Sequence, residues 1–572
     1  MTGETVGISI PRNYFDLSQE HIFTAEAGLI YPIYSILLMP GDVVKVSNQC
    51  VIRQQPTINP SFSNYKVKFW DFVVAIRNLD KNIYRFLSGY AEYTNNVKWE
   101  KPLPKWKPSH IEKTRPGTLW DFLENPVNCI PPNKYCQLDY FRQAYGYIYD
   151  LYFRNETRED SILNELQEPG SWKGEDLLRV NYDRDYYTTS LPNPTLGDPQ
   201  AIPISGLANA KWDPKNIKFY DNTMVGTTGY IGGTEADSVA FIQGIRGEGT
   251  TEDNASEYFA NEILNKNSID MSNAASILIR DLTQALAIEA LNTINALAGI
   301  RDDEFLNANW GESPSNEALQ YPIPFGKSQM EIIVSEVLQT ANNTNEKDGV
   351  GDLYGHGIGV GESTQDTFHA KEFSIYIKLM YIKTNNLYGG QGIDKAKCQN
   401  EIYDFPFPIL NHLGMQPITG AELVCISEKR PESNDKGITL KEDKVETEEN
   451  LEYNDRYIGY KPVYEEYTRK LDKVSGLFIQ EQYYEQGTDT VKTKDNLYNW
   501  TEARFFSIKK DERPIINKDF LKVNLDNRNY QVVDNTIERS QFLIWHKNIV
   551  DCWRSMSKKR LPTMLGVTEG LR

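Results

Sequence analysis

A cluster of basic residues near the C-terminal end is the group of side chains best suited to bind a ligand: Arg554, Lys558, Lys559 and Arg560. Trp553 and Met556 lie beside these four residues. Lys and Arg neutralise backbone phosphates, and bases stack on aromatic rings without any reading of base sequence. The cluster therefore predicts a contact with nucleic acid, whereas the simpler explanation is a solvated chain end.

The short motifs typical of enzymes are incomplete or absent. Residues 326–328 are Gly-Lys-Ser, the sequence with which a phosphate-binding loop ends. Such a loop also has a glycine five residues before Gly326, and Tyr321 occupies that position instead. The alternating glycines of residues 355–361 lack the G-x-G-x-x-G spacing of a dinucleotide site, and no βαβ unit surrounds them. We therefore expect a flexible loop there, within a longer connection at residues 340–364. The sequence has no G-x-S-x-G nucleophile elbow and no EF-hand spacing.

Histidine and cysteine, which bind most transition metals, are scattered over the chain. No His forms an H-E-x-x-H motif or pairs closely with a Cys, and no two Cys form a C-x-x-C pair. We therefore expect no catalytic residue, no metal, no cofactor and no disulfide framework, and we expect buried, reduced thiols. The 79 Asp and Glu residues are so abundant that a carboxylate pair for glycoside hydrolysis could be proposed anywhere. The Cys and His residues are Cys50, Cys129, Cys136, Cys398, Cys425, Cys552, His21, His110, His356, His369, His412 and His546.

The overall charge argues against a protein that binds nucleic acid over its whole surface. The 572 residues carry a formal net charge of −18, with an isoelectric point near 5.0. If the protein encloses nucleic acid, a local patch or another molecule must neutralise most of the phosphates. The 34 Tyr and 10 Trp residues are typical of protein interfaces, although a biased nucleotide composition explains them equally well.

Secretion and membrane insertion are not indicated. The N-terminal sequence MTGETVGISIPRNYF lacks a basic stretch followed by an apolar one, and no apolar run approaches the length of a membrane span. We therefore expect synthesis and folding in a cytoplasm.

Four segments have the patterns of β-strands. Residues 38–53 begin with a Pro-Gly-Asp turn and continue with alternating apolar and polar residues, which predicts a half-buried strand. Residues 65–77 start in the same way, but the apolar positions then change parity, so we expect a bulge or burial on both faces. Residues 373–383 alternate again, and residues 542–553 are apolar and strand-like.

Two segments have helical spacing instead. Residues 138–155 place Leu138, Tyr145 and Tyr152 on one apolar stripe, which predicts a helix packed on a sheet. Residues 273–298 predict a second helix, with Gly299 as its C-terminal cap.

Very long connections separate these elements. Residues 203–269 are rich in Gly, Asn, Thr and Asp, and residues 428–455 are strongly charged, so we expect a long surface excursion and a solvated loop. Connections beyond about 12–15 residues are usually functional or disordered. Such an arrangement suits a protein that must contact several neighbours at once, because each contact requires its own surface.

Taken in order, these segments resemble the major capsid proteins of the microviruses, and the gokushovirus branch in particular. The strongest motif is LDYFRQAYGYIYDLYFRNET at residues 138–157, where the family has a helix that ends in a Tyr/Trp-x-Arg-x-x-Asn pattern. DRDYYTTSLPNP at residues 183–194 is similar to the family's DYFTSxLPxPQ element, with Tyr187 in place of the usual Phe and Asn193 in place of a frequent Trp. The ordered set covers most of the chain. The other matching segments are the 38–53 strand, residues 273–299, IIVSEVLQT, EFSIYIKLMYIKT, NLYGGQGI, YDFPFPILNHLGMQPI, residues 457–478 and SQFLIWHKNIVDCWRSMSKKRLPTMLGV.

The resemblance implies an all-β fold, namely an eight-stranded antiparallel jelly-roll barrel with long loop insertions and several added α-helices, in a single domain over residues 1–572. It implies a structural protein whose copies assemble through pentamers into a T=1 icosahedral shell of about sixty copies. That shell would enclose a circular single-stranded DNA phage genome, and the basic cluster would touch the DNA on its inner face. The implied partners are other copies of the chain, a small basic DNA-binding protein, a DNA pilot protein and a scaffolding protein, with assembly in the host cytoplasm.

The 203–269 insertion lies where gokushoviruses carry protrusions at the threefold axes. The resemblance therefore implies that it contacts a host surface receptor, and a merely tolerated loop is the alternative. The 428–455 loop is longer than is usual in the family. From the residues alone, a β-rich protein that binds or cleaves polysaccharides is a second hypothesis, because aromatic platforms and paired carboxylates suit sugars. A cellular jelly-roll lectin is a third.

Overall fold

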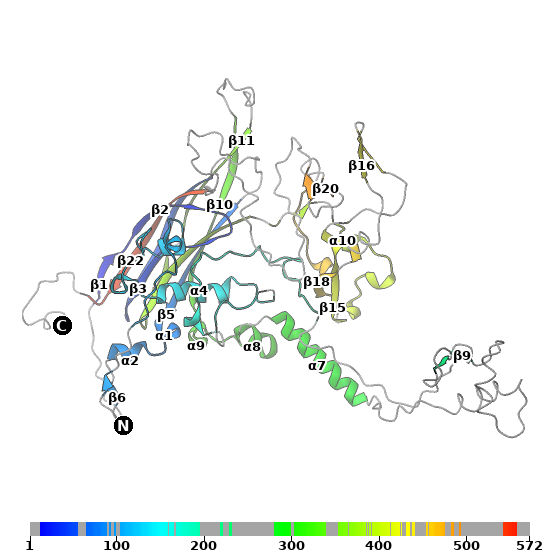
Figure 1. Cartoon of the computed structure of the whole chain (residues 1–572), viewed down its shortest axis with the longest axis horizontal. Helices are drawn as coiled ribbons and strands as arrows, with labels where there is room; N and C mark the ends of the chain where they lie inside the picture. The colour runs from blue at the N-terminus through cyan, green and yellow to red at the C-terminus, as the bar shows by residue number, and fades with distance from the viewer. Residues whose placement is uncertain are drawn as a thin grey trace, which may run out of the picture. The chain divides into compact units, whose positions relative to one another are not determined.

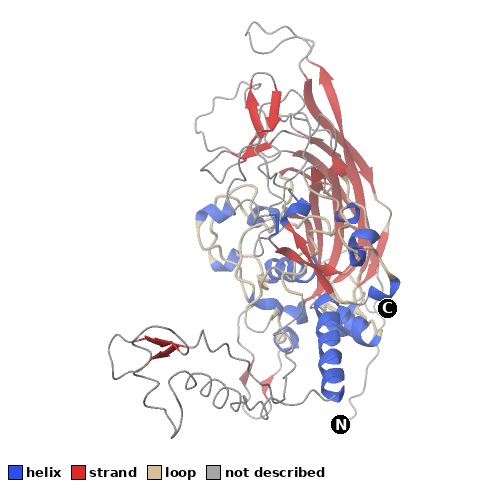
Figure 2. Ribbon diagram, turned by 90° about the vertical axis from the view of Figure 1, so that its right-hand side faces the viewer, coloured by secondary structure: helices blue, strands red, loops and turns tan. Residues whose placement is uncertain are grey.

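The computed structural model describes residues 12–54, 65–88, 103–194, 279–298, 302–338, 353–423, 457–474 and 542–556, with short breaks inside these ranges, and several short segments elsewhere. Its main feature is a curved antiparallel sheet of ten strands (Figure 1). Figure 2 shows the long strands side by side as one curved layer. The strands are β1 (Asn13–Asp16), β2 (Gln19–Ala25), β3 (Ile30–Leu38), β4 (Val43–Gln54), β5 (Tyr65–Ala75), β10 (Ile323–Leu338), β11 (Leu353–Glu362), β12 (Asp366–His369), β13 (Ser374–Thr384) and β22 (Phe542–Arg554).

The ten strands occupy eight positions, because β2 follows β1 along β22 and β12 follows β11 along β4. One half of the sheet has the order β1/β2–β22–β4–β11/β12, and the other has the order β3–β13–β5–β10. Strand β10 connects the halves: its first part pairs with β5 and its last part pairs with β11. This order is that of an eight-stranded jelly roll, with two sheets that face each other across one core. The predicted all-β jelly-roll fold is confirmed.

The chain contains shorter elements besides the ten strands of the barrel. Contacts divide the chain into two units, Met1–Pro194 with Leu297–Arg572 and Thr195–Ala296. The second unit contains β8, β9 and most of α7 among the described elements. The helices are α1 (Ile76–Leu79), α2 (Ile83–Ser88), α3 (Leu119–Phe122), α4 (Tyr140–Tyr152), α7 (Ile279–Ala298), α8 (Asp302–Trp310), α9 (Asn316–Leu319), α10 (Gly420–Leu423) and α12 (Glu465–Thr468). The remaining strands are β6 (Ala91–Glu92), β7 (Val97–Lys98), β8 (Lys218–Tyr220), β9 (Thr228–Tyr230), β14 (Tyr388–Gly389), β15 (Met415–Thr419), β16 (Pro431–Asn434), β17 (Gly437–Leu440), β18 (Tyr457–Pro462), β19 (Lys473–Val474), β20 (Gln482–Tyr484) and β21 (Val491–Thr493).

The four predicted strands are confirmed as β4, β5, β13 and β22. Buried and half-buried side chains alternate along β4, as expected of a strand with one face on the core. In β5 the alternation gives way to burial on both faces around Phe72 and Val74. The second face is covered by α4, since the rings of Tyr152 and Phe72 lie 5.0 Å apart and those of Phe153 and Trp70 lie 5.6 Å apart.

Helix α4 confirms the predicted helix at 138–155, but it is buried almost all round and not along one stripe. Arg142 is buried and donates hydrogen bonds to the carbonyls of Trp172 and Gly174. The Trp172 ring packs so closely on Gly146 that a Cβ there would lie 2.4 Å from it. A distant loop therefore covers the helix face that the spacing predicts to be exposed. The second predicted helix is α7, and its proposed cap, Gly299, lies outside the described residues.

The glycine-rich stretch expected to be a flexible loop is in fact strand β11, so that prediction is wrong. It pairs with β10 on one side and with β4 on the other. Gly359 and Gly361 point into the barrel, where Met330 of β10 leaves no room for a side chain: a Cβ on Gly361 would lie 2.9 Å from the Met330 Cβ. The glycines are thus packing positions and not hinges.

Candidate functional site

Arg554 represents the predicted basic cluster in the part of the chain that the structure describes, and Lys558, Lys559 and Arg560 lie outside it. The Arg554 guanidinium donates from Nε to Oδ2 of Asp42 at 2.8 Å, and Nη2 lies 2.8 Å from the same oxygen in an ion pair. Nη2 also donates to the carbonyl of Leu37 at 3.0 Å. Asp42 is fully buried in the turn between β3 and β4. Arg554 therefore fastens the end of the last strand to this turn, which is a structural task.

An aromatic group lies on the outer side of the same strand end. The Trp553 ring lies 5.6 Å from the Tyr14 ring, and Lys45 Nζ lies 5.2 Å from the Trp553 ring centre. Tyr14 donates a hydrogen bond to Oδ1 of Asp551 at 2.8 Å. This surface combines rings and a cation, which suit base stacking and phosphate contact, with a carboxylate of the opposite charge. It is suited to binding and contains no nucleophile paired with a base.

No metal centre is found among the described residues, which contain no group of three or more His, Cys, Asp or Glu side chains that could hold an ion. His546 is fully buried in the barrel and stacks on Phe69 at 5.6 Å. His369 is exposed beside Arg12, and the Gly-Lys-Ser sequence lies within β10.

The prediction of buried thiols is only half right. Cys50, Cys136 and Cys552 are buried, whereas Cys129, Cys398 and Cys425 are exposed, and all six thiols are free. Cys50 and Cys552 lie in strands where alternation predicts the core, whereas Cys136 is buried in an irregular connection. The exposed ones lie in irregular connections, where the sequence has no periodicity from which burial could be predicted.

Glu422 is a buried acid that sequence reasoning missed. It lines a cavity of about 240 Å³ together with Lys395, Tyr403 and Glu466. Burial raises the pKa of Glu422 above its ordinary value. Its two oxygens accept hydrogen bonds from the Thr419 N–H at 3.0 Å and the Tyr186 hydroxyl at 3.0 Å. The carboxyl group therefore holds the 183–194 motif against α10, and both of its oxygens are already engaged within the fold.

A projecting apolar segment follows this cavity. We call residues 401–413 the apolar segment, since six of their large side chains are exposed. Two short turns order it, at Ile402–Asp404 and Pro408–Leu410, and a third turn at Lys395–Lys397 precedes it. The hydroxyls of Tyr464 and Tyr467 donate to the carbonyls of Tyr403 and Asp404 at 2.8 and 2.9 Å. The exposed fractions are 65% for Ile402, 68% for Tyr403, 52% for Phe405, 41% for Phe407, 86% for Ile409 and 67% for Leu413.

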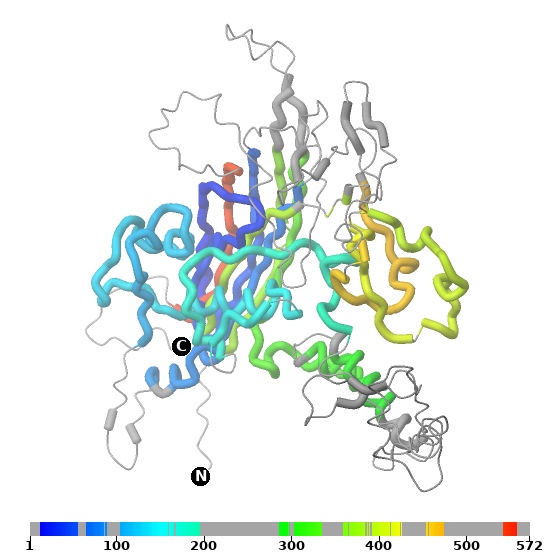
Figure 3. Tube along the Cα trace, turned by 45° about the vertical axis from the view of Figure 1, so that its right-hand side comes forward, coloured from blue at the N-terminus to red at the C-terminus, as the bar shows by residue number. Residues whose placement is uncertain are grey.

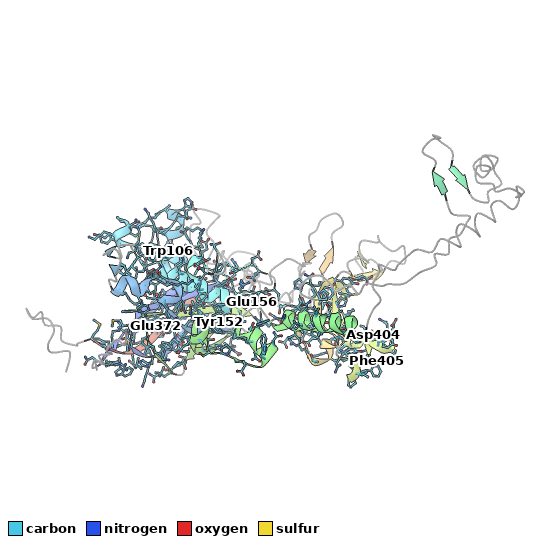
Figure 4. All side chains as sticks on the ribbon, turned by 90° about the horizontal axis from the view of Figure 1, so that it is seen from below. Trp106, Tyr152, Glu156, Glu372, Asp404 and Phe405 are labelled. Carbon is cyan, nitrogen blue, oxygen red and sulfur yellow. The ribbon has the colours of Figure 1, made fainter. Side chains whose placement is uncertain are left out.

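Figure 4 shows Asp404 and Phe405 next to each other on this segment. Large exposed apolar surfaces on soluble proteins mark sites of interaction. Because the segment is held by hydrogen bonds and by two prolines, its side chains are presented in a fixed arrangement. The segment is therefore suited to contact another protein surface.

Within the described ranges, no helix combines the length and the apolar character needed to cross a bilayer.

Comparison with known proteins agrees with the fold. The family described as "Capsid protein (F protein)" matches residues 4–564. Capsid protein VP1 of Chlamydia phage 1 is 23% identical over 531 residues, which cover 82% of this chain and 85% of that protein. Capsid protein VP1 of Spiroplasma virus 4 is 23% identical over 454 residues, with 73% and 77% covered. Capsid protein VP1 of Bdellovibrio phage phiMH2K is 21% identical over 510 residues, with 86% and 84% covered.

The family match spans nearly the whole chain. The chain combines a jelly-roll barrel with an exposed surface that is suited to contact and not to catalysis. The predicted resemblance to microvirus capsid proteins is confirmed, and so is the prediction that the protein is not an enzyme. The chain therefore belongs to the phage capsid protein (F protein) family, as a structural protein of the virion.

Proposed function

We propose that about sixty copies of this chain assemble through pentamers into a T=1 icosahedral shell around a circular single-stranded DNA genome. The observation that carries the proposal is the apolar segment, an ordered and exposed set of large side chains in a protein of a capsid family. Each contact between copies would be weak, and the closed shell would be stable because many contacts form at once.

The DNA inside such a shell needs more positive charge than this chain supplies. Because its net charge is −18, the chain offers little positive charge to neutralise the phosphates. A small basic protein packaged with the genome would supply most of it. The cluster Arg554, Lys558, Lys559 and Arg560 would add local contacts on the inner face, beside the Trp553 and Tyr14 rings. A scaffolding protein and a DNA pilot protein complete the proposed partners, and assembly would take place in the host cytoplasm.

The 203–269 insertion is proposed to form protrusions at the threefold axes and to face the host cell. The 428–455 loop is proposed to be a solvated insertion. Deleting residues 203–269 should leave shell formation intact and abolish adsorption of the particles to host cells. Unchanged adsorption would show that the insertion is only a tolerated loop.

Sedimentation of the full chain from cells that carry the complete phage genome, with electron microscopy of the fast fraction, tests the shell. Pentamers or uniform icosahedral particles are expected. A chain that stays a monomer or small oligomer and binds glycans in a glycan-binding screen would favour the polysaccharide hypothesis instead.

The DNA contact is tested by replacing Lys558, Lys559 and Arg560 with Gln. We expect empty shells to form in normal yield and to retain less DNA, measured by the absorbance ratio at 260 and 280 nm. Arg554 is left intact in this variant because its ion pair with Asp42 is structural. Normal DNA content would contradict the proposed role of the cluster.

A further inference from the structure

The outer face of the β1/β2–β22–β4–β11/β12 sheet carries a row of apolar side chains across four strands. Ile22 of β2 lies opposite Trp545 of β22, which lies opposite Val51 of β4, which lies opposite Val360 of β11. Ile22 is 78% exposed and Val360 is 71% exposed, while Val51 and Trp545 between them are half-buried. Side chains directly opposite one another on neighbouring strands are in contact distance, so the four form a continuous strip.

A second row runs beside the first, two residues further along each strand. It consists of Leu543 of β22, Arg53 of β4, Ile358 of β11 and Ile333 of β10, and Thr24 of β2 ends it opposite Leu543. Leu543, Ile358 and Ile333 are 40%, 47% and 64% exposed. We call the two rows together the apolar sheet face. In this position a sheet that faced only water would carry polar residues.

The apolar sheet face has a polar border on one side. The next row consists of Glu20, Lys547, Gln49 and Glu362. Lys547 forms an ion pair with Glu20 at 3.3 Å, and Gln49 donates a hydrogen bond to Glu362 at 3.2 Å. An apolar centre with a polar rim is the usual anatomy of a protein interface.

The two apolar surfaces of this chain differ in a complementary way. Arg53 is the charged residue within the apolar sheet face, and it forms no ion pair with any residue that the structure describes. The apolar segment contains Glu401 and Asp404 and neither Lys nor Arg. A sheet face whose cation, Arg53, has no ion-pair partner among the described residues therefore matches an acidic segment in both polarity and charge.

We propose that the apolar sheet face of one copy binds the apolar segment, residues 401–413, of a neighbouring copy. The inference rests on the proposed function, because a shell supplies the second copy. Two different surfaces meet in this contact, so it is heterologous, and a heterologous contact gives a ring when its repeated rotation closes, as a pentamer requires. The contact removes from water the exposed apolar side chains of both surfaces, which is a favourable change.

The test uses one charge substitution on each surface of the full chain. Val360→Asp disrupts the sheet face, and Ile409→Asp disrupts the segment. Both side chains are more than two-thirds exposed, so we expect circular dichroism spectra and melting temperatures like those of wild type. The matched control is Thr367→Asp, which adds the same charge at an exposed position of the same sheet, opposite Lys45.

Neither variant alone should form particles, and Thr367→Asp should assemble like wild type. When the two purified variants are mixed, each retains the surface that the other lacks. Because a single contact is weak, the mixture is measured by light scattering over a series of increasing chain concentrations. A 1:1 dimer of twice the chain mass should form at the high end of the series, and it should not grow further.

The inference is overturned if Val360→Asp or Ile409→Asp forms particles in wild-type yield, or if the mixture gives no dimer. Loss of assembly in Thr367→Asp would also overturn it, because the effect would then not be specific to the apolar sheet face. Absence of particles from the wild-type chain, in cells that carry the complete phage genome, would instead overturn the proposed function itself.

Discussion

Nζ of Lys378 lies 3.1 Å from Oδ1 of Asp71 in the interior of the barrel, and the Lys378 side chain is fully buried. The Tyr376 hydroxyl donates to the same carboxylate at 2.6 Å, and Lys378 Nζ lies 3.3 Å from Oδ1 of Asn48. Lys378, Tyr376 and Asp71 belong to one sheet and Asn48 to the other. The hydrogen bond from Lys378 to Asn48 therefore links this ion pair to the other sheet through their shared core.

Removing one partner of this pair should be strongly destabilising. Lys378→Met leaves the Asp71 carboxylate buried without its counter-ion, and we expect the free energy of unfolding to fall by about 3–5 kcal/mol. Urea unfolding followed by circular dichroism measures the loss. The double variant Asp71→Leu with Lys378→Met removes both charges and should recover most of the stability.

The control is the exposed ion pair between Lys371 and Glu317, with N and O atoms 3.0 Å apart. Lys371→Met should cost less than about 1 kcal/mol, because solvent screens an exposed pair. Equal losses of unfolding free energy in Lys371→Met and Lys378→Met would show that burial does not make the Lys378–Asp71 pair more costly to break.

His546 should make the barrel sensitive to acid. Its two ring nitrogens have no hydrogen-bond partner among the described residues. Burial first, and then the charges of Lys378 and His21, hold the pKa of His546 well below the ordinary value of 6.5. Below pH 6.5 His546 binds a proton in the unfolded chain but stays neutral in the folded chain. The stability that His546 contributes is therefore present above pH 6.5 and is lost as the pH falls.

The measurement compares the unfolding free energy of wild type and His546→Phe between pH 7.5 and pH 5. Phe keeps the stacking on Phe69 and cannot titrate, so the stability of this variant should fall less on acidification, by up to about 1.4 kcal/mol per pH unit. His369→Gln, at an exposed position, should keep the wild-type pH dependence. Parallel curves for His546→Phe and wild type would rule this explanation out.

Arg554 should matter for stability before it matters for DNA. Arg554→Gln leaves the buried Asp42 carboxylate without its counter-ion, and we expect a loss of about 3 kcal/mol. Arg554→Lys should restore only part of it, because an ammonium group cannot reproduce the paired geometry of the guanidinium. Thermal unfolding of both variants provides the comparison, and a wild-type melting temperature for Arg554→Gln would show that the pair is dispensable.

Glycine at position 361 should be required by the side chain opposite it. Gly361→Ala places a Cβ 2.9 Å from the Met330 Cβ, and such overpacking costs about 1–3 kcal/mol. Adding Met330→Gly removes that Cβ, so the double variant should lose less stability than the sum of the two single changes. Additive losses in urea unfolding would mean that the two positions do not meet.

The sequence predicts those strands that bury one face in the core and leave the other face more exposed. Val44 and Val46 alternate with polar residues because one face of β4 meets the core, and this pattern suffices to find it. Strand β11 escapes such analysis, since its inward positions are glycines and leave no periodic mark. For the same reason the apolar sheet face could not be predicted: its rows exist only once the register of five strands is known.

Long-range partners are equally invisible in the sequence. Arg554 stands 512 residues from Asp42, and from the sequence it is one more basic residue in a cluster. The burial of Arg142 in α4 depends on the loop around Trp172, which has no pattern that indicates where it packs. The family resemblance supplies the fold and the order of the elements, whereas these contacts come from the structure alone.

The position of β22 has a consequence for the order of events in synthesis. It is the last strand of the barrel in sequence, yet it lies between β2 and β4, as the red strand among blue ones in Figure 3 shows. While the ribosome holds residues 542–554, β2 and β4 have no partner along those edges. The barrel is completed only after residues 542–554 have left the ribosome. A product that stops before residue 542 lacks this strand, so the sheet closes only in chains that have been translated through β22.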